Sequence, residues 1–217
     1  MQNLGNTCFM NSVLQCLANT EPLVKFFLTE CFANHINERS TLGARGRLAI
    51  AFSELINDMY EGESSYVAPW DVKNIIARRA HQFQGFAQHD SQEMLSFLLE
   101  TLHEDLNDVM KKPYVEYKDS NERPDAEVSA EYWEGFRSRE KSLLVDLFYG
   151  QLKSRVQCTA CNKISISFDP FNMLSLPIPQ PSKDYRTVIR YYPLSLVKRP
   201  LELHFELGEY TTISEVR

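Results

Sequence analysis

Long apolar runs are absent from this 217-residue sequence. A membrane-spanning helix requires about 18 or more consecutive apolar residues, and no such stretch occurs, so the sequence predicts no transmembrane segment. The first residues also lack the basic stretch followed by an apolar core that marks a secretory signal peptide. No internal repeat is found, and the composition excludes a collagen-like chain or a disulfide-rich miniprotein. These absences leave a globular protein as the prediction.

Basic residues are fewer than acidic residues, and cysteines are few. The 23 Lys and Arg residues are outnumbered by 29 Asp and Glu residues, which gives a net charge of −6. Such a chain is poorly suited to a nucleic-acid backbone, and a basic partner fits it better. The five cysteines are an odd number and no signal peptide precedes them, which argues for a reducing compartment. We therefore expect the cysteines to act as a nucleophile, as metal ligands or as buried filler.

The first half of the chain has the hydrophobic pattern of helices. With 43% hydrophobic residues the chain can bury a sizeable core. Apolar residues at helical spacing predict helices from Cys8, over residues 48–59, from Pro69 and over residues 95–109. Polar residues from 116 to 131 then interrupt this pattern.

The pattern changes to strands beyond a short apolar cluster at residues 143–148. Alternating apolar side chains predict strands over residues 163–168 and 201–207. After the first of these strands, an extended segment cannot be helical, because it is interrupted by Pro170, Pro177, Pro179 and Pro181. The chain therefore combines a helical first part with a strand-rich second part.

Cys8 follows a turn-rich segment in which Gly5 and Asn6 can adopt a positive φ. A thiol at a helix start feels the positive end of the macrodipole and the unpaired backbone N–H groups, and both favour its thiolate form. The turn can also bring backbone donors and the Asn3 amide close to the sulfur, as is needed to hold an oxyanion during acyl transfer. The alternative is a buried cysteine at the start of an ordinary helix.

Three long motifs resemble, in the same order, those of the ubiquitin-specific proteases: NLGNTCFMNSVLQCL, QHDSQEMLSFLLETLHEDLN and LFYGQLKSRVQCTACNKISISFDPFNMLSLPIP. The resemblance is closest to the subgroup with DUSP and ubiquitin-like domains. It implies an α+β, papain-like cysteine protease fold of the ubiquitin-specific protease type. We expect a helical thumb over residues 1–146, β-rich zinc fingers over 147–182, and a β segment over 183–217. That last segment either continues the fingers or opens an inserted ubiquitin-like domain.

The resemblance implies a role for each matching residue. Cys8 matches the family's nucleophile, and Asn3 matches the side chain that donates to the oxyanion. The residues that match a segment near the bound C-terminal tail of ubiquitin are Gln88, Asp90, Gln92 and Glu93. The carboxylates can pair with arginines of that basic tail, and the amides can bond to its extended backbone. Capping of a helix by Asp90 and Glu93 is an equally good interpretation, and the two roles are compatible.

Cys158 and Cys161 have the C-x-x-C spacing with which two thiolates bind one tetrahedral Zn²⁺ from a tight turn. A structural site needs two further ligands, and no second C-x-x-C occurs in these 217 residues. The resemblance implies that those ligands come from elsewhere. A redox pair and a knuckle that has lost its metal are the alternatives, and the flanking strands favour zinc. Cys16 and Cys31 are predicted to be packed in the core.

A cysteine protease also needs an imidazole to activate the thiol and to protonate the leaving amine. The histidines without a recognisable motif are assigned to surface or packing roles, and they are His35, His81, His103 and His204. His89 does not match the family's base, and the family's His box with its Asp or Asn partner finds no match. We therefore expect the catalytic His and Asp outside this chain, and the chain alone to be inactive.

The predicted function is that of a deubiquitinase. The thiol of Cys8 would hydrolyse isopeptide or peptide bonds at the C-terminal glycine of ubiquitin, with ubiquitin and ubiquitinated proteins as partners and no nucleic acid or membrane. The predicted location is the cytoplasm and also the nucleus. The alternatives are a non-catalytic ubiquitin-binding zinc module and a zinc-dependent scaffold. The presence of both Cys8 and Asn3 argues against the non-catalytic module.

Overall fold

The computed structural model describes residues 1–118, 120, 123–178, 185–193 and 199–207. The chain divides into two compact units, Met1–Met173 and Leu174–Arg217, and each is described by itself. Across the described residues, every helix is too short or too polar to traverse a lipid bilayer. The expected ranges 147–182 and 183–217 lie partly outside the described residues, and the division of the chain at those boundaries stays a prediction.

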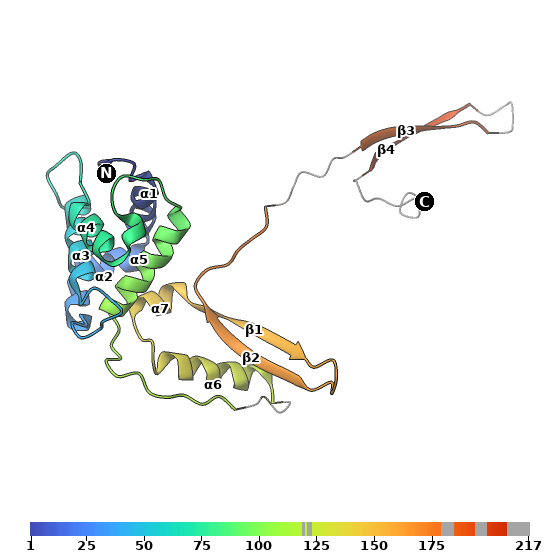
Figure 1. Cartoon of the computed structure of the whole chain (residues 1–217). Helices are drawn as coiled ribbons and strands as arrows, with labels where there is room; N and C mark the ends of the chain where they lie inside the picture. Colours follow the sequence, from blue (N-terminus) through green and yellow to red (C-terminus); the bar gives the residue numbers. More distant parts are fainter. Residues whose placement is uncertain (119, 121–122, 179–184, 194–198, 208–217) are drawn as a thin grey trace. The chain divides into compact units, whose positions relative to one another are not determined.

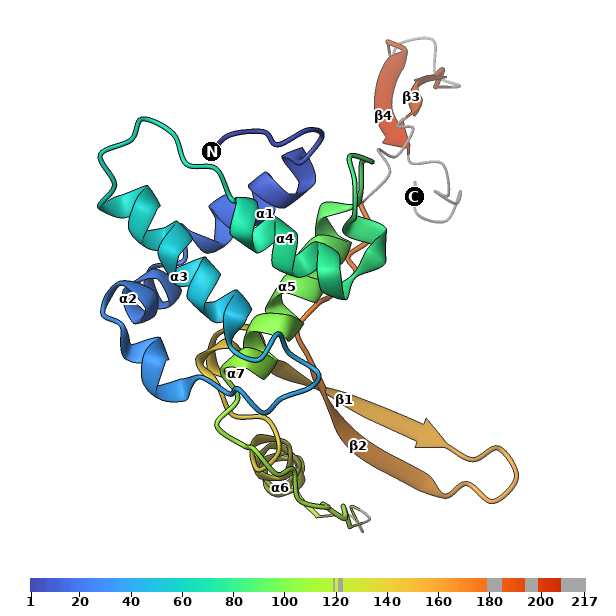
Figure 2. The same cartoon turned by 60° about the vertical axis from the view of Figure 1, so that its left-hand side comes forward.

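The first unit is a helical body followed by a hairpin (Figure 1). Its helices are α1 (Cys8–Leu17), α2 (Glu21–Leu28), α3 (Arg47–Tyr60), α4 (Trp70–Arg79), α5 (Ser91–Asp105), α6 (Asp125–Arg137) and α7 (Leu143–Phe148), with short 3₁₀ turns η1 (Cys31–His35) and η2 (His81–Phe83). Helix α5 contacts α1, α3 and α7, and α3 also contacts α2 and α4. The view in Figure 2 shows α5 crossing behind α4 and beside α1.

The core of the helical body is built by the apolar stripes of α1, α3 and α5. The fully buried residues of these stripes include Met10, Leu14, Leu48, Phe52, Ile56, Met94, Leu98 and Leu102. Phe27 of α2 meets Phe52 edge to face, with ring centroids 5.0 Å apart. Each large side chain buried in this way stabilises the fold by about 1.5–3 kcal/mol. The predicted helices from Cys8, over 48–59, from Pro69 and over 95–109 are confirmed within a few residues at their ends.

Two helices are not predicted by the hydrophobic pattern of the sequence. Helix α2 was not predicted, and α6 begins within the polar interval that was expected to interrupt the helices. Only Val128 of α6 is fully buried, so an apolar stripe is weak there. The helix is held by other features: acidic residues in its first turn suit the macrodipole, and Arg123 lies 2.6 Å from the Glu131 carboxylate.

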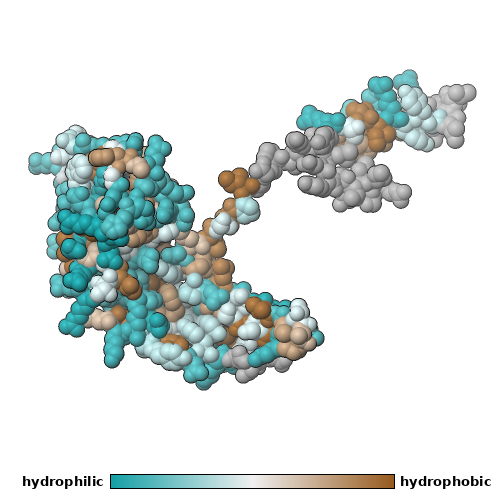
Figure 3. Space-filling model, viewed as in Figure 1, coloured by the Kyte–Doolittle hydropathy of each residue, from teal (hydrophilic) through white to brown (hydrophobic). Residues whose placement is uncertain are grey.

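Strands β1 (Gly150–Gln157) and β2 (Ile164–Phe171) form an antiparallel hairpin in which Gly150 faces Phe171 and Gln157 faces Ile164. Helix α6 packs on β2, where Tyr132 meets Phe168 with ring centroids 6.1 Å apart. The predicted strand over 163–168 is confirmed and is longer than expected. Figure 3 shows hydrophobic residues on the surface over the hairpin, while the helical body is mostly hydrophilic on the viewed face.

The second unit contains one antiparallel hairpin among its described residues. Strand β3 (Tyr185–Tyr191) pairs with β4 (Leu201–Leu207), so that Tyr191 faces Leu201. The predicted strand over 201–207 is therefore confirmed, and Leu201 and Leu203 are exposed. Pro179 and Pro181, which were expected in an extended segment, lie outside the described residues.

A buried polar network fixes the C-terminal end of α5. The His103 ring lies 2.7 Å from Ser142 Oγ and 2.9 Å from Glu140 Oε2. The Lys112 ammonium donates to Glu104 at 2.8 Å and to Glu140 at 2.7 Å. Burial acts to raise the pKa of Glu140, but hydrogen bonds from His103 and Lys112 outweigh it and lower that pKa. The network joins α5 to the segment before α7 without leaving either acidic group unpaired.

The neighbouring residue Asp105 joins α5 to α3. Its fully buried carboxylate accepts backbone N–H groups from Ala44, from Leu48 at 2.9 Å and from Ala49 at 3.3 Å. The bonds from Leu48 and Ala49 satisfy N–H groups in the first turn of α3 that have no partner within the helix. Burial raises the pKa of Asp105, against the opposing effect of these backbone bonds.

Candidate active site

Cys8 is the first residue of α1, and its side chain is exposed. The helix forms here because Met10, Val13, Leu14 and Leu17 recur at helical spacing and bury one face in the core. The preceding residue, Thr7, occupies the N-cap position. The predicted helix start is confirmed, and the alternative of a buried cysteine is wrong.

The turn before Cys8 is held by its own hydrogen bonds. Asn3 Oδ1 accepts the N–H of Gly5 at 3.1 Å, the N–H of Thr7 at 3.0 Å and the Thr7 hydroxyl at 3.2 Å. The Thr7 hydroxyl oxygen in turn accepts the N–H of Leu4 at 3.0 Å. Gly5 has φ +99° and Asn6 has φ +51°, as the sequence predicts. The chain therefore reverses tightly in front of the thiol.

These bonds determine what Asn3 can still donate. Its side-chain oxygen Oδ1 accepts three hydrogen bonds. The amide nitrogen Nδ2 has no protein partner among the residues that the structure describes. Since an amide oxygen only accepts and an amide nitrogen only donates, Nδ2 is the group available to an oxyanion. Asn3 is exposed, as is Cys8, so both can meet a substrate.

The turn is also held by hydrogen bonds to Phe86 and to α1. The Asn6 side chain donates from Nδ2 to the carbonyl oxygen of Phe86 at 2.9 Å. Asn11 of α1 donates from Nδ2 to the carbonyl oxygen of Gln2 at 3.0 Å, which holds the start of the chain to the helix. Asn6 and Asn11 thus shape the turn and its helix.

The four residues predicted to contact ubiquitin lie at and before the start of α5, which packs against α1. Asp90 caps α5, and its carboxylate accepts the N–H of Gln92 at 2.6 Å, so the capping interpretation is confirmed for this residue. Gln92 donates from Nε2 to Ser96 Oγ and to Met173 Sδ, each at 3.1 Å. Gln88 and Glu93 are exposed. Their predicted role in binding stays a prediction.

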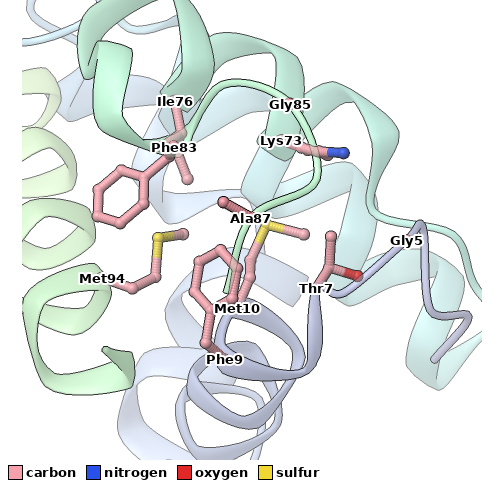
Figure 4. Close-up of a pocket in the computed structure, with 10 residues that line it drawn as sticks. All are labelled: Gly5, Thr7, Phe9, Met10, Lys73, Ile76, Phe83, Gly85, Ala87 and Met94. Carbon is pink, nitrogen blue, oxygen red and sulfur yellow. The ribbon is translucent and has the colours of Figure 1, made fainter. Parts of the chain in front are cut away.

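A small pocket lies beneath the turn and the segment that supports it (Figure 4). Thr7, Phe9 and Met10 line it from the side of α1, and Lys73 and Ile76 from the side of α4. Phe83 of η2 closes it together with Gly85 and Ala87 of the loop between η2 and α5. The start of α1, α4 and this loop therefore meet around one space.

The histidines of the first unit contact residues other than Cys8. The ring of His35 lies 2.6 Å from Asp108, and that of His81 lies 2.8 Å from Gln84. His103 belongs to the buried network, and His89 packs edge to face against Phe9 and Phe83. His89 Nε2 is buried without a protein hydrogen bond among the described residues. The positions of His35, His81 and His103 agree with their assignment to packing and surface roles.

Cys158 and Cys161 are exposed and lie in the turn that joins β1 to β2. The backbone closes this turn with bonds from Cys158 N to Lys163 O and from Asn162 N to Cys158 O, both 2.9 Å. Hydrogen bonds from the backbone N–H of Cys161, the backbone N–H of Ala160 and the Cys161 thiol lower the pKa of Cys158. A thiolate with N–H donors suits a metal ligand.

The cluster of three potential ligand side chains within the described residues lies elsewhere, at His103, Glu104 and Glu140, where the Lys112 ammonium already pairs both carboxylates. The role of Cys158 and Cys161 as zinc ligands stays a prediction. Cys16 and Cys31 are exposed, so the prediction that they are core residues is wrong. Cys16 lies on α1 outside its buried face, and Cys31 opens η1 beside the hydroxyl of Thr29.

Sequence reasoning missed Phe86 and Lys73, which flank the turn. Neither belongs to a charged or nucleophilic motif, and Phe86 stands outside any helical stripe. The sequence indicates these contacts only indirectly, because a glycine such as Gly5 in a tight turn leaves room for the side chain of a neighbouring segment.

An accessible thiol at a helix start, preceded by a turn with an amide donor, is the arrangement of a cysteine hydrolase nucleophile. A family profile described as ubiquitin carboxyl-terminal hydrolase matches residues 1–212. The chain therefore belongs to the ubiquitin carboxyl-terminal hydrolase family, and within it to the ubiquitin-specific protease type.

Curated relatives match most of this chain. Over 99% of its own length, this chain is 46% identical to human ubiquitin carboxyl-terminal hydrolase 32. It is 47% identical to mouse ubiquitin carboxyl-terminal hydrolase 4, again over 99%, and 51% identical to ubiquitin carboxyl-terminal hydrolase 9 of Arabidopsis thaliana over 88%. The chain spans 14%, 22% and 21% of the length of these relatives, respectively.

Solved structures support the fold. A chain of the SAGA DUB module containing Ubp8 and bound to monoubiquitin matches with a TM-score of 0.58 and 18% identity, over 96% of this chain and 45% of that one. The same module bound to ubiquitin aldehyde matches with a TM-score of 0.54 and 17% identity. The α+β, papain-like fold of the ubiquitin-specific protease type is thus confirmed.

Proposed function

We propose that this chain is the nucleophile-bearing part of a thiol-dependent deubiquitinase. The observation that carries the proposal is the exposed thiol of Cys8 at the start of α1, behind a self-bonded turn that leaves Asn3 Nδ2 free to donate. Family membership supports ubiquitin, joined through its C-terminal glycine to a lysine or an N-terminal amine, as the substrate.

The reaction proceeds by acyl transfer. The Cys8 thiolate attacks the carbonyl carbon of the terminal glycine, and the developing oxyanion accepts from Asn3 Nδ2 and from backbone N–H groups at the start of α1. The amine leaves with a proton from the general acid, and ubiquitin remains as a thioester on Cys8. Water then attacks the thioester, which releases the ubiquitin carboxylate and restores the thiol.

The general base and its orienting partner come, in this proposal, from polypeptide outside these 217 residues. The placement of His35, His81 and His103 on other partners supports it. Gln88 and Glu93 are exposed beside α1 and are proposed to contact the ubiquitin tail, with Asp90 and Gln92 adding to the same surface. The basic tail suits the carboxylates of Asp90 and Glu93.

Cys158 and Cys161 are proposed to bind a structural Zn²⁺ together with two ligands from outside this chain. The lowered pKa of Cys158 supports this proposal, because zinc is bound by thiolates. When bound, the metal would brace the end of the hairpin and take no part in bond cleavage. We propose the cytoplasm and the nucleus as the location, which suits exposed thiols that remain unpaired.

The proposal is tested with ubiquitin that carries a C-terminal electrophile. The complete natural polypeptide is mixed with this probe, and the site of attachment is mapped by peptide mass spectrometry. We expect one adduct, on Cys8, with none on Cys16 and Cys31, which are also exposed. Binding without an adduct would replace the enzyme by a non-catalytic ubiquitin-binding module.

A further inference from the structure

Phe86 fills the space that Gly5 leaves open in the turn before Cys8. A Cβ atom placed on Gly5 would lie 2.6 Å from Cδ1 of the Phe86 ring, so any other residue at position 5 would displace the ring. The carbonyl oxygen of the same residue accepts from Asn6 Nδ2 at 2.9 Å. Phe86 therefore contacts the turn twice, through its ring and through its backbone.

A cation on α4 holds the ring from another direction. The Lys73 ammonium lies 4.7 Å from the centroid of the Phe86 ring and 5.6 Å from that of Trp70. Both distances are within the range of an attractive cation–π contact. Phe86 and Trp70 are 64% and 48% exposed, so burial alone does not fix the Phe86 ring.

The residue before Phe86 has no close side-chain neighbours. Gly85 has φ +80°, and a Cβ atom added there would meet nothing within 4 Å, so no packing at Gly85 fixes the Phe86 ring. Gly85 and Lys73 both line the pocket beneath the turn (Figure 4). The position of the ring thus depends on its contacts with Lys73, Gly5 and Asn6.

We propose that Phe86 is a positioning residue for the Cys8 nucleophile, and that Lys73 holds its ring against the turn. The proposal rests on the proposed function. Asn6 lies two residues before Cys8, and the N–H of Thr7 bonds to Asn3, so a shift of Asn6 reaches both the thiol and the oxyanion donor. Misplacement of reacting groups by about 1 Å can cost about 10²-fold in rate.

The experiment measures kcat and KM for cleavage of a ubiquitin amide by the complete natural polypeptide, per active site titrated with the ubiquitin electrophile. Titration removes any misfolded fraction from kcat. The variants are Phe86→Ala, which removes the ring, and Phe86→Tyr, which keeps it. Lys73→Met removes the charge but keeps the stem, and Lys73→Arg keeps the charge.

We expect Phe86→Ala to lower kcat about 10-fold with KM within about 2-fold, because positioning acts on the chemical step. Phe86→Tyr should retain kcat, Lys73→Met should lower it about 3-fold, and Lys73→Arg should retain it. An unchanged kcat in Phe86→Ala overturns the proposal. A loss confined to KM also overturns it, because Phe86 would then be a substrate contact.

The outcomes separate this inference from the proposed function. If the unaltered protein forms no adduct with the ubiquitin electrophile, the proposed function fails. If it forms the adduct on Cys8 and all four variants turn over at the same rate, the inference about Phe86 and Lys73 alone fails.

Discussion

Cys8 directly follows a turn and the pair Cys158 and Cys161 lies on one, but the two turns are supported differently. The turn before Cys8 is bonded through Asn3 and joined to a helix whose inner face lies in the core. The turn of the cysteine pair closes an exposed hairpin and is held by two backbone bonds.

The difference suits the roles proposed for the two sites. A nucleophile must be held in one orientation before the substrate arrives, so its support has to come from the fold. A metal ligand obtains its final geometry from the metal, so an open turn with N–H donors is sufficient support for the proposed zinc ligands. Substitutions at the two turns should therefore affect different properties.

The largest effect is expected from Cys8→Ser. The alcohol is a much weaker nucleophile than the thiol, so the rate of ubiquitin amide cleavage by the complete polypeptide should fall by about 10⁴-fold or more. Cys16→Ser, which alters an exposed thiol on the same helix, serves as the matched control and should leave the rate unchanged. Comparable losses in both variants would remove the special role of the turn.

Substitution of Asn3 should have the next largest effect. Asn3→Ala and Asn3→Asp both remove the amide donor and should each lower kcat by about 10²–10³-fold, the usual cost of one oxyanion donor. Asn3→Asp keeps an oxygen that can accept from Gly5 and Thr7, so only Asn3→Ala should also lower the free energy of unfolding, by about 1 kcal/mol. A kcat retained in Asn3→Asp would show that the amide is structural.

Lys112→Met should destabilise the helical body. The substitution leaves Glu104 and Glu140 without their shared cation. Breaking a fully buried ion pair costs about 3–5 kcal/mol, and the partial exposure of Lys112 lowers the expected loss to about 2–3 kcal/mol. Urea denaturation followed by circular dichroism measures it. A loss below about 0.5 kcal/mol would mean that the network contributes little.

Glu140→Gln should produce a smaller, pH-dependent loss. Because the pKa of Glu140 is lowered in the folded protein from its ordinary value of 4.5, its contribution is present above that value and lost as the pH falls through the folded pKa. The variant should be about 1 kcal/mol less stable than the unaltered protein at pH 7. The difference should shrink below about pH 4.5, and a difference that grows in acid would contradict the assigned direction.

The smallest effect on the helical body is expected from Cys158→Ser. The cysteine lies on an exposed turn, so the unfolding free energy of the helices should change by no more than about 0.5 kcal/mol. Zinc bound to the complete polypeptide should be lost, as measured by native mass spectrometry. Retention of one zinc ion per chain would refute the role of this pair as ligands.

Local patterns predicted the parts of the site that are contiguous in sequence. Met10, Val13, Leu14 and Leu17 fix α1 and thereby place Cys8 at its start. The positive φ of Gly5 and Asn6 also followed from residue type. Each of these features depends on spacing within a few residues, which a sequence displays directly.

Other features arise from contacts between distant segments, which no local pattern displays. Phe86 meets Gly5 across 80 residues of chain, and Lys73 reaches the same ring from α4. Helix α6 was missed because it is held mainly by ion pairs and aromatic contacts and buries little apolar surface. The exposure of Cys16 was also missed. A free cysteine is usually counted as a buried apolar residue, but Cys16 lies on the solvent-exposed face of α1.

A crystal structure of the complete polypeptide with Cys8 joined to ubiquitin aldehyde tests the proposed roles of Cys8 and Asn3 most directly. The hemithioacetal oxygen stands in for the oxyanion of the reaction. We predict that this oxygen lies about 2.7–3.1 Å from Asn3 Nδ2, with the bonds from Asn3 Oδ1 to Gly5 and Thr7 intact. A hemithioacetal whose oxygen points away from Asn3, or an adduct on another cysteine, would contradict the account.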